Sequence, residues 1–269
     1  MIKTNEIKKA ALSKLDWKKS FIISIIFVLA NVALSYALEY AINLTINIPI
    51  LNFAVNILYI ALFIPLSFGF ISAMSKLYKS ERVSGTTIFN EAVLNFTKTI
   101  GIFVRTLIKI IIPSFIIIFA GIGILFITTQ NLPVTNENLS GYSMFISLIY
   151  LAVLIGVALS TIPYALSSYI LTDNKEMTSK EIVNRSADLM KNKIWNFIKL
   201  IISFLGWFVV LAVIVTIANM AINEMVGNIA NWIGMMLLMP YMVTSIRVFY
   251  EEASDTKEVI IKKEESSEN

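Results

Sequence analysis

The stretch WNFIKLIISFLGWFVVLAVIV, from Trp195 to Val215, decides the fold class of this chain. Lys199 is the single charged residue within it. A helix needs about 20 predominantly apolar residues to cross the hydrocarbon core of a bilayer. The stretch therefore predicts a transmembrane helix, and the question becomes how many others accompany it.

The composition of the whole chain indicates a membrane protein. Of its 269 residues 57% are hydrophobic and only 15% are charged, and the mean hydropathy is +0.76. Soluble domains carry roughly 25% charged residues. A soluble core of this size cannot hide so much apolar surface, so the solvent of this chain must be lipid.

Six stretches are long and apolar enough to span a membrane. We place them at residues 20–42, 51–77, 104–128, 144–171, 195–222 and 228–250. The first follows a lysine-rich start, but its weak cleavage site favours an uncleaved span over a signal peptide. The sequence thus predicts an all-α membrane protein of about six transmembrane helices.

The basic residues predict the orientation of the spans. All 22 lysines and arginines fall on one side, that is before span one, between spans two and three, between four and five, after span six, or just inside the adjoining ends of these spans. The three other connections carry only Glu39, Glu137 and Glu224 as charged residues. Because cytoplasmic loops are enriched in lysine and arginine, both termini are expected in the cytoplasm and the chain in the cell membrane. The basic pI then reflects orientation, and no nucleic-acid partner is expected.

Two cytoplasmic segments predict an internal repeat. Thr86–Lys109 and Lys180–Ser203 align without gaps at an offset of 94 residues. Each reads as an amphipathic helix in the membrane interface, leading into an odd-numbered span. The start of the chain looks like a weaker third copy.

We therefore expect one membrane domain over residues 1–250. It would contain three hairpin repeats at roughly 1–80, 81–175 and 176–250. The charged segment 251–269 is expected to be a disordered tail.

Each even-numbered span contains a proline inside its apolar run. A proline removes one backbone hydrogen bond and bends a helix, and in lipid the freed carbonyl needs a new partner. One interpretation is a polar seam where three kinked helices meet; the other, which base rates favour, is ordinary packing of small residues. The candidate seam residues are Pro65, Pro163, Tyr164, Ser167, Ser168, Pro240, Tyr241, Thr244 and Ser245.

Charged residues at the inner ends of the spans predict contacts with anionic lipid headgroups. Arg105, Lys109, Lys199 and Arg247 hold such positions, where long basic side chains extend toward the headgroups. No carboxylate is predicted at mid-membrane, which argues against ion coupling. The loop carboxylates Asp173, Glu176, Glu181 and Asp188 are interpreted as a solvated face.

The residue types present limit the chemistry. The chain contains no cysteine and no histidine, so thiol chemistry and the commonest general base and metal ligand are missing. We expect no catalytic residues, no cofactor and no metal site.

Several motifs resemble those of a bacterial membrane-protein family known as domain of unknown function 975. They are IPYALSSYILTDN (Ile162–Asn174), the segment Ser186 to Lys191, FIKLIISFLGW (Phe197–Trp207), and the dipeptides PY and FY at the two ends of Pro240–Tyr250. Tyr164 and Asn192 stand where the family pattern has glycine. The resemblance implies a six-span fold and no established activity.

Three functional hypotheses follow. The first is a non-enzymatic membrane protein that binds a membrane protein, a lipid or a membrane-active peptide, in an export or self-protection role. The second is a transporter or channel for a small or amphiphilic solute through the proline seam, because broken helices in repeats are typical of transporters. The third and weakest is an enzyme acting on lipid.

Overall fold

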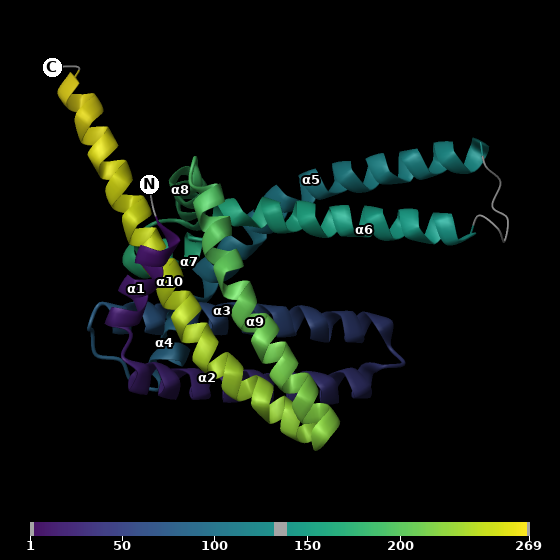
Figure 1. Ribbon diagram of the computed structural model, residues 1–269, viewed down its shortest axis with the longest axis horizontal. Coiled ribbons are helices and arrows are strands. Elements are labelled where there is room, and N and C mark those ends of the chain that lie inside the picture. Colours follow the sequence, from purple (N-terminus) through teal and green to yellow (C-terminus); the bar gives the residue numbers. More distant parts are fainter. Residues whose placement is uncertain (1–2, 132–138, 268–269) are drawn as a thin grey trace.

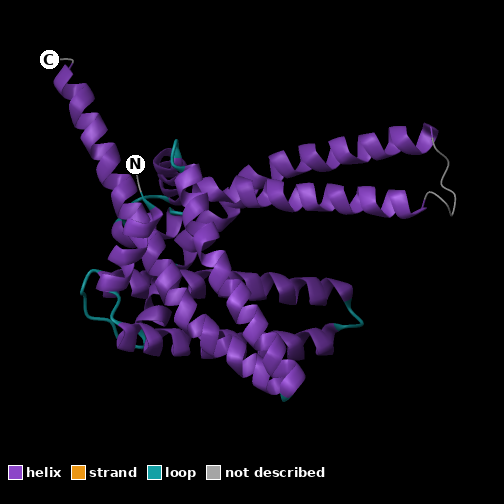
Figure 2. Ribbon diagram, viewed as in Figure 1, coloured by secondary structure: helices purple, strands orange, loops and turns teal. Residues whose placement is uncertain are grey.

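The computed structural model describes residues 3–131 and 139–267, and every regular element in them is a helix (Figure 2). The elements are α1 (Thr4–Lys14), α2 (Trp17–Thr45), α3 (Pro49–Tyr78), α4 (Thr87–Leu94), α5 (Phe96–Asn131), α6 (Leu139–Thr161), the 3₁₀ turn η1 (Ile162–Tyr164), α7 (Ser167–Asp173), α8 (Ser179–Met190), α9 (Ile194–Ala221) and α10 (Glu224–Ser267).

Six candidate membrane spans are present, as predicted. They cover Trp17–Thr45, Pro49–Tyr78, Phe96–Ile124, Ile146–Asp173, Ile194–Ala221 and Glu224–Asp255. The third begins eight residues earlier than predicted, because helix α5 already starts at Phe96. α10 runs on to Ser267, through the segment where the sequence predicts a disordered tail.

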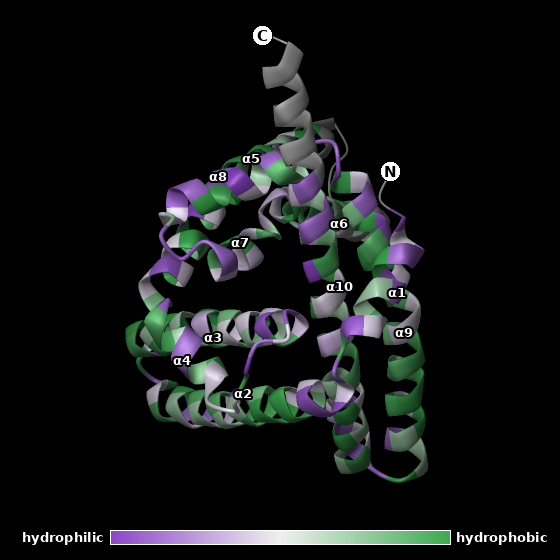
Figure 3. Ribbon diagram, turned by 90° about the vertical axis from the view of Figure 1, so that its left-hand side faces the viewer, coloured by the Kyte–Doolittle hydropathy of each residue, from purple (hydrophilic) through white to green (hydrophobic). Residues whose placement is uncertain are grey.

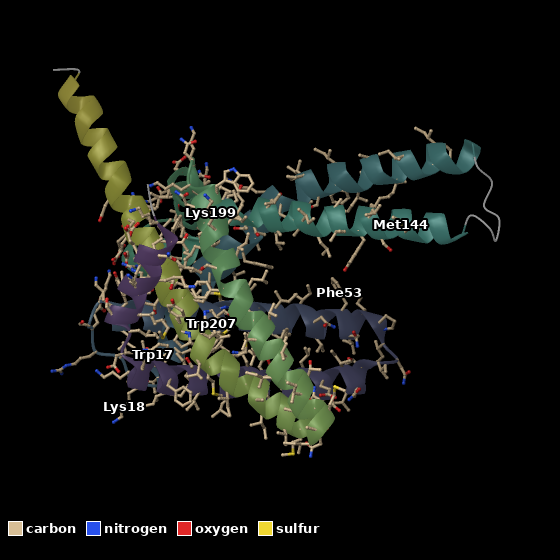
Figure 4. The ribbon with its side chains drawn as sticks, viewed as in Figure 1. Trp17, Lys18, Phe53, Met144, Lys199 and Trp207 are labelled. Atoms are coloured by element: carbon tan, nitrogen blue, oxygen red, sulfur yellow. The ribbon has the colours of Figure 1, made fainter. Side chains whose placement is uncertain are left out.

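The long helices form three hairpin arms that diverge from one common base (Figure 1). The arms are α2–α3, α5–α6 and α9–α10, and within each arm the two helices pack against each other. Phe53, Met144 and Trp207, one on each arm, are 68%, 67% and 53% exposed (Figure 4). Apolar side chains this exposed over whole helices suit a lipid solvent and identify a multi-pass membrane protein.

The buried core lies in the base, where the arms converge with the short helices. α1 packs against α10, α4 against α3, and α8 against α5 and η1. The hydrophilic colouring is concentrated on these short segments, whereas α2 and α9 are largely hydrophobic (Figure 3). Ile7, Ile88 and Ile182, one from each short helix, are at most 1% exposed.

Helix α4 packs one side against the protein and leaves other apolar residues exposed. The protein-facing side holds Ile88 and Ala92, whereas Val93 and Phe96 are 74% and 42% exposed. Gly69 of α3 sets this orientation, since a Cβ there would lie 2.1 Å from the carbonyl oxygen of Ile88. Only glycine, which has no Cβ, lets the backbone of α4 approach α3 this closely.

The three prolines have different local effects. Pro65 and Pro240 lie inside the continuous helices α3 and α10. At Pro163 the fourth span instead breaks into η1 before α7 resumes. Ser186 of α8 stabilises the break, because its hydroxyl donates to the carbonyl of Pro163 at 2.8 Å and accepts from the amide of Leu166 at 3.2 Å.

Candidate functional site

A groove of about 740 Å³ lies between α2, α3 and α10, and we call it the α2–α3–α10 groove. Its lining consists of Phe27, Val28, Asn31, Val32, Ser35, Tyr36 and Glu39 of α2, Tyr59, Phe63, Ser67, Phe70 and Ile71 of α3, Ala165 and Tyr169 near the break in the fourth span, and Trp232, Met235, Met239, Met242, Val243 and Ile246 of α10. Its volume is in the range of sites that hold small organic ligands.

One wall of the groove carries a polar stripe on α2. Asn31, Ser35 and Glu39 recur every four residues and therefore share one helix face. The amide nitrogen of Asn31 donates to the carbonyl of Phe27 at 2.8 Å, while its buried side-chain oxygen has no partner among the described residues. An unsatisfied acceptor inside a groove marks a place where a bound molecule could donate a hydrogen bond.

Glu39 gives the groove its charge. Of the described residues that line it, Glu39 is the one ionisable carboxylate, and it lies toward the end of α2 that is remote from the base. The groove thus combines apolar walls with a row of hydrogen-bond acceptors on α2, the last of which, Glu39, is negatively charged.

The facing wall is apolar and adaptable. Three methionines follow Trp232 along α10 at helical spacing, namely Met235, Met239 and Met242. Methionine side chains are flexible and polarisable, so they adjust to ligands of different shape. On the opposite side, the rings of Phe27 and Phe70 stack with centroids 4.5 Å apart and both line the groove.

Ser67 of α3, two residues after Pro65 in the predicted seam, lines this groove, whereas the nine candidate seam residues named above do not. Tyr164 and Ser168 instead line a second cavity of about 640 Å³ beside α9. The residues proposed as one seam therefore separate into different environments within the described part of the chain.

The other hydroxyls of the seam are packed in the base. Ser167 and Thr244 are buried, and their hydroxyl oxygens have no partner in the described residues. Ser245 donates to the carbonyl of Tyr241 at 2.8 Å, one turn back in α10. The ring of Tyr241 meets that of Phe204 edge to face at 5.1 Å. These contacts are those of ordinary helix packing.

The predicted headgroup residues divide into two groups. Arg105, Lys109 and Lys199 are exposed at the base ends of α5 and α9, and Figure 4 labels Lys199 there. Arg247 is 2% exposed, so the expectation that it reaches headgroups needs correction. Its Nη2 donates to Asp173 at 2.7 Å and to Glu251 at 3.1 Å.

The carboxylate of Asp173 also departs from the predicted solvated face. Besides Arg247 it accepts from Lys79 at 2.9 Å, which ties α7 to the ends of α10 and α3. Glu181, in contrast, is exposed and closes a capping box with Thr178 at the start of α8.

Glu91 is a buried charge that the sequence did not reveal. Its carboxylate is 5% exposed and accepts from Lys76 at 2.6 Å and from Lys175 at 3.0 Å. Ser72 and Asn95 donate to it as well, each at 3.2 Å. Burial raises the pKa of Glu91, but hydrogen bonds from the two lysines outweigh burial, so its pKa lies below the ordinary value.

A sequence signal for the groove existed in α2. Asn31, Ser35 and Glu39 are polar residues spaced four apart in an apolar span, so they lie on one face of the helix. Glu91 offered none, since its partners lie 15 and 84 residues away in the chain. In the described residues, no group of three or more histidine, cysteine, aspartate or glutamate side chains could hold a metal ion.

The comparisons place the chain in a family. It belongs to the family described as protein of unknown function (DUF975), whose model matches residues 1–257. No curated protein and no solved structure matches the chain.

Proposed function

We propose that this protein is a non-enzymatic membrane protein that binds a cationic amphiphile, such as a membrane-active peptide, in the α2–α3–α10 groove. The observation that carries the proposal is the polar stripe of Asn31, Ser35 and Glu39 set into an otherwise apolar groove. An amphiphile would bury its apolar body against the methionines of α10. Its positive group would face Glu39.

Charge supports this choice of ligand. The described ends of the α2–α3 and α9–α10 arms that are remote from the base carry no lysine or arginine, so the negative charge of Glu39 at the mouth of the groove attracts cations. Anionic amphiphiles would be repelled at the same place. A groove open to lipid also admits a ligand directly from the bilayer.

The proposal includes the topology predicted by the basic residues. Both termini and the base lie in the cytoplasm of a cell whose membrane the three arms cross. The short helices α1, α4 and α8 lie at the inner interface, where anionic headgroups face their lysines. Each short helix begins one of three related hairpin units, and its packing against the end of a returning span supports such a repeat.

Tryptophan quenching tests the ligand and the place together. Two variants each retain one tryptophan, Trp232 in the groove or Trp207 on the exposed face of α9, with phenylalanine at the other tryptophan positions. In lipid nanodiscs they are titrated with a brominated alkyl trimethylammonium or with the matching alkyl sulfate. We expect saturable quenching of Trp232 fluorescence by the cationic probe alone. Quenching of Trp207 should rise without saturation for both probes, because it follows only their partitioning into the bilayer.

Glu39→Gln should abolish the preference for the cationic probe, and Glu224→Gln is the matched control. Glu224 begins α10 at the same end of the molecule and does not line the groove. Equal, non-saturable quenching of both tryptophans would disprove binding in the groove.

A further inference from the structure

The packing of α8 against α5 gathers three basic side chains around one small cavity. The cavity measures about 180 Å³ and is lined by Arg105, Ile108, Lys109, Lys180, Val183 and Asn184. Arg105 and Lys109 are one turn apart on α5, and Lys180 and Asn184 are one turn apart on α8. Two parallel pairs of polar side chains therefore face a common space.

Close packing of the Ser179 side chain against a glycine of α5 supports this geometry. A Cβ at Gly101 of α5 would lie 2.6 Å from the hydroxyl of Ser179, so glycine lets the start of α8 approach α5. The hydroxyl of Ser179 then donates to the carbonyl of Lys98 at 3.1 Å. The start of α8 is thereby held against α5, which keeps Lys180 beside Arg105 and Lys109.

No carboxylate among the described residues forms an ion pair with the cations of this cavity. Lys109 is oriented by a hydrogen bond to Asn184 at 3.0 Å and by the ring of Tyr164, whose centroid lies 5.3 Å from Nζ. Arg105 and Lys180 form no ion pair within residues 3–131 and 139–267. Elsewhere in the base the buried cation Arg247 has two carboxylates, so a lining with three positive charges and no carboxylate is distinctive.

An apolar track leads away from the cavity along α5. Ile108 lines the cavity and is 56% exposed, and Ile112 and Phe115, further along the same arm, are 62% and 53% exposed. A phosphate bound by the cations would therefore have an exposed apolar surface beside it for acyl chains. A soluble phosphate would make no use of that surface.

We propose that the α5–α8 cavity is a specific site for an anionic phospholipid of the inner leaflet, whose phosphate is held by Arg105, Lys109 and Lys180. Arginine contributes two parallel donors to a phosphate, and lysine contributes a point charge. The site is separate from the α2–α3–α10 groove and does not depend on the ligand proposed there.

Native mass spectrometry of the purified full chain in detergent tests this site. Phosphatidylglycerol and phosphatidylcholine with the same acyl chains are titrated separately. We expect the native protein to retain one tightly bound phosphatidylglycerol molecule. Arg105→Gln or Lys180→Gln should weaken its binding about fivefold, because each basic residue near the membrane surface contributes about 1 kcal/mol to the attraction of anionic lipid. Both side chains are exposed and form no ion pair with the part of the chain that the structure describes, so these variants should fold normally.

Lys199→Gln is the matched control, because Lys199 is an exposed lysine at the inner end of a span outside the cavity. It should leave the tight lipid in place. An equal loss with Lys199→Gln, or equal binding of both lipids, would show diffuse attraction and overturn the site. Displacement of the lipid by millimolar inorganic phosphate would also overturn it, in favour of a free phosphate site.

Discussion

Nη2 of Arg247 lies 2.7 Å from a carboxylate oxygen of Asp173, although the two residues are 74 positions apart in the chain. The guanidinium is 2% exposed, and the contact joins α10 to α7 after the break in the fourth span. Glu251 binds the same guanidinium and accepts at 2.6 Å from the hydroxyl of Tyr78 in α3. The pair therefore belongs to a polar network that joins the ends of three spans in the base.

Asp173→Asn should destabilise the protein. It leaves the buried charge of Arg247 with one carboxylate, and losing a partner of a buried pair costs about 2 kcal/mol or more. Thermal unfolding in detergent measures the loss. Glu176→Gln, at an exposed neighbouring carboxylate, should leave the midpoint unchanged. If both variants unfold alike, the ion pair does not stabilise the base.

The double replacement Asp173→Leu with Arg247→Met should be more stable than Asp173→Asn alone. Replacing both charges by apolar side chains removes the buried guanidinium that Asp173→Asn leaves with Glu251 as its one carboxylate. If the double variant is less stable than Asp173→Asn, the destabilisation comes from altered packing in the base and not from the loss of a partner for the Arg247 charge.

Glu91 should make stability depend on pH in the acid range. Because its pKa is lowered in the folded protein, its contribution is complete above the ordinary value of 4.5 and is lost as the pH falls through the folded value. Glu91→Gln should cost about 2 kcal/mol at pH 7, since it unpairs two lysines in the base.

The difference between the native protein and Glu91→Gln should then shrink as the pH is lowered from 5 to 3. Unfolding midpoints across this range measure it in detergent. A constant difference across the range would contradict ionisation of Glu91 as the cause.

Gly69→Ala should disrupt the docking of α4. The new Cβ would lie 2.1 Å from the carbonyl oxygen of Ile88, so α4 must move, at a cost of about 2 kcal/mol. Gly206→Ala is the matched control, because nothing lies within 4 Å of its Cβ position. Alanine there should be neutral or stabilise α9 by up to about 1 kcal/mol. Unfolding midpoints that fall equally in both variants would exclude the clash.

Ser186→Ala should weaken the break at Pro163. It removes the partner of two backbone groups, the carbonyl of Pro163 and the amide of Leu166, and each unsatisfied group costs about 1–3 kcal/mol. Ser168→Ala, beside the break on α7, removes a hydroxyl that makes neither contact. Hydrogen exchange at Leu166 should rise in the first variant only; unchanged protection in both would reject the role of Ser186.

The proposed topology can be tested directly because the chain contains no cysteine. Asn47→Cys, between α2 and α3, should react in intact cells with a membrane-impermeant maleimide. Glu81→Cys, between α3 and α4, should react only after the cells are opened. Both positions are exposed. The reverse pattern would place the termini outside.

The sequence by itself determined the fold class, the number of spans and most of their bounds. Apolar length is a local property that the bilayer imposes, so the run from Trp195 to Val215 indicates a span without knowledge of its neighbours. Among the short helices, α8 starts at a local signal, the capping box of Thr178 and Glu181, whereas α1 and α4 start without a side-chain cap. The polar stripe on α2 could also have been identified from its spacing.

Only the tertiary structure decided how those elements meet. The sequence placed Arg247 at a lipid headgroup, since an isolated arginine at the end of a span extends toward water. The fold instead brings Asp173 and Glu251 to it, and the burial of Glu91 with Lys76 and Lys175 arises in the same way. Pairings of this kind join residues far apart in the chain, and they follow from how helices pack in the base rather than from any local pattern. The α2–α3–α10 groove and the α5–α8 cavity exist for the same reason, because each is the space left where separate helices converge.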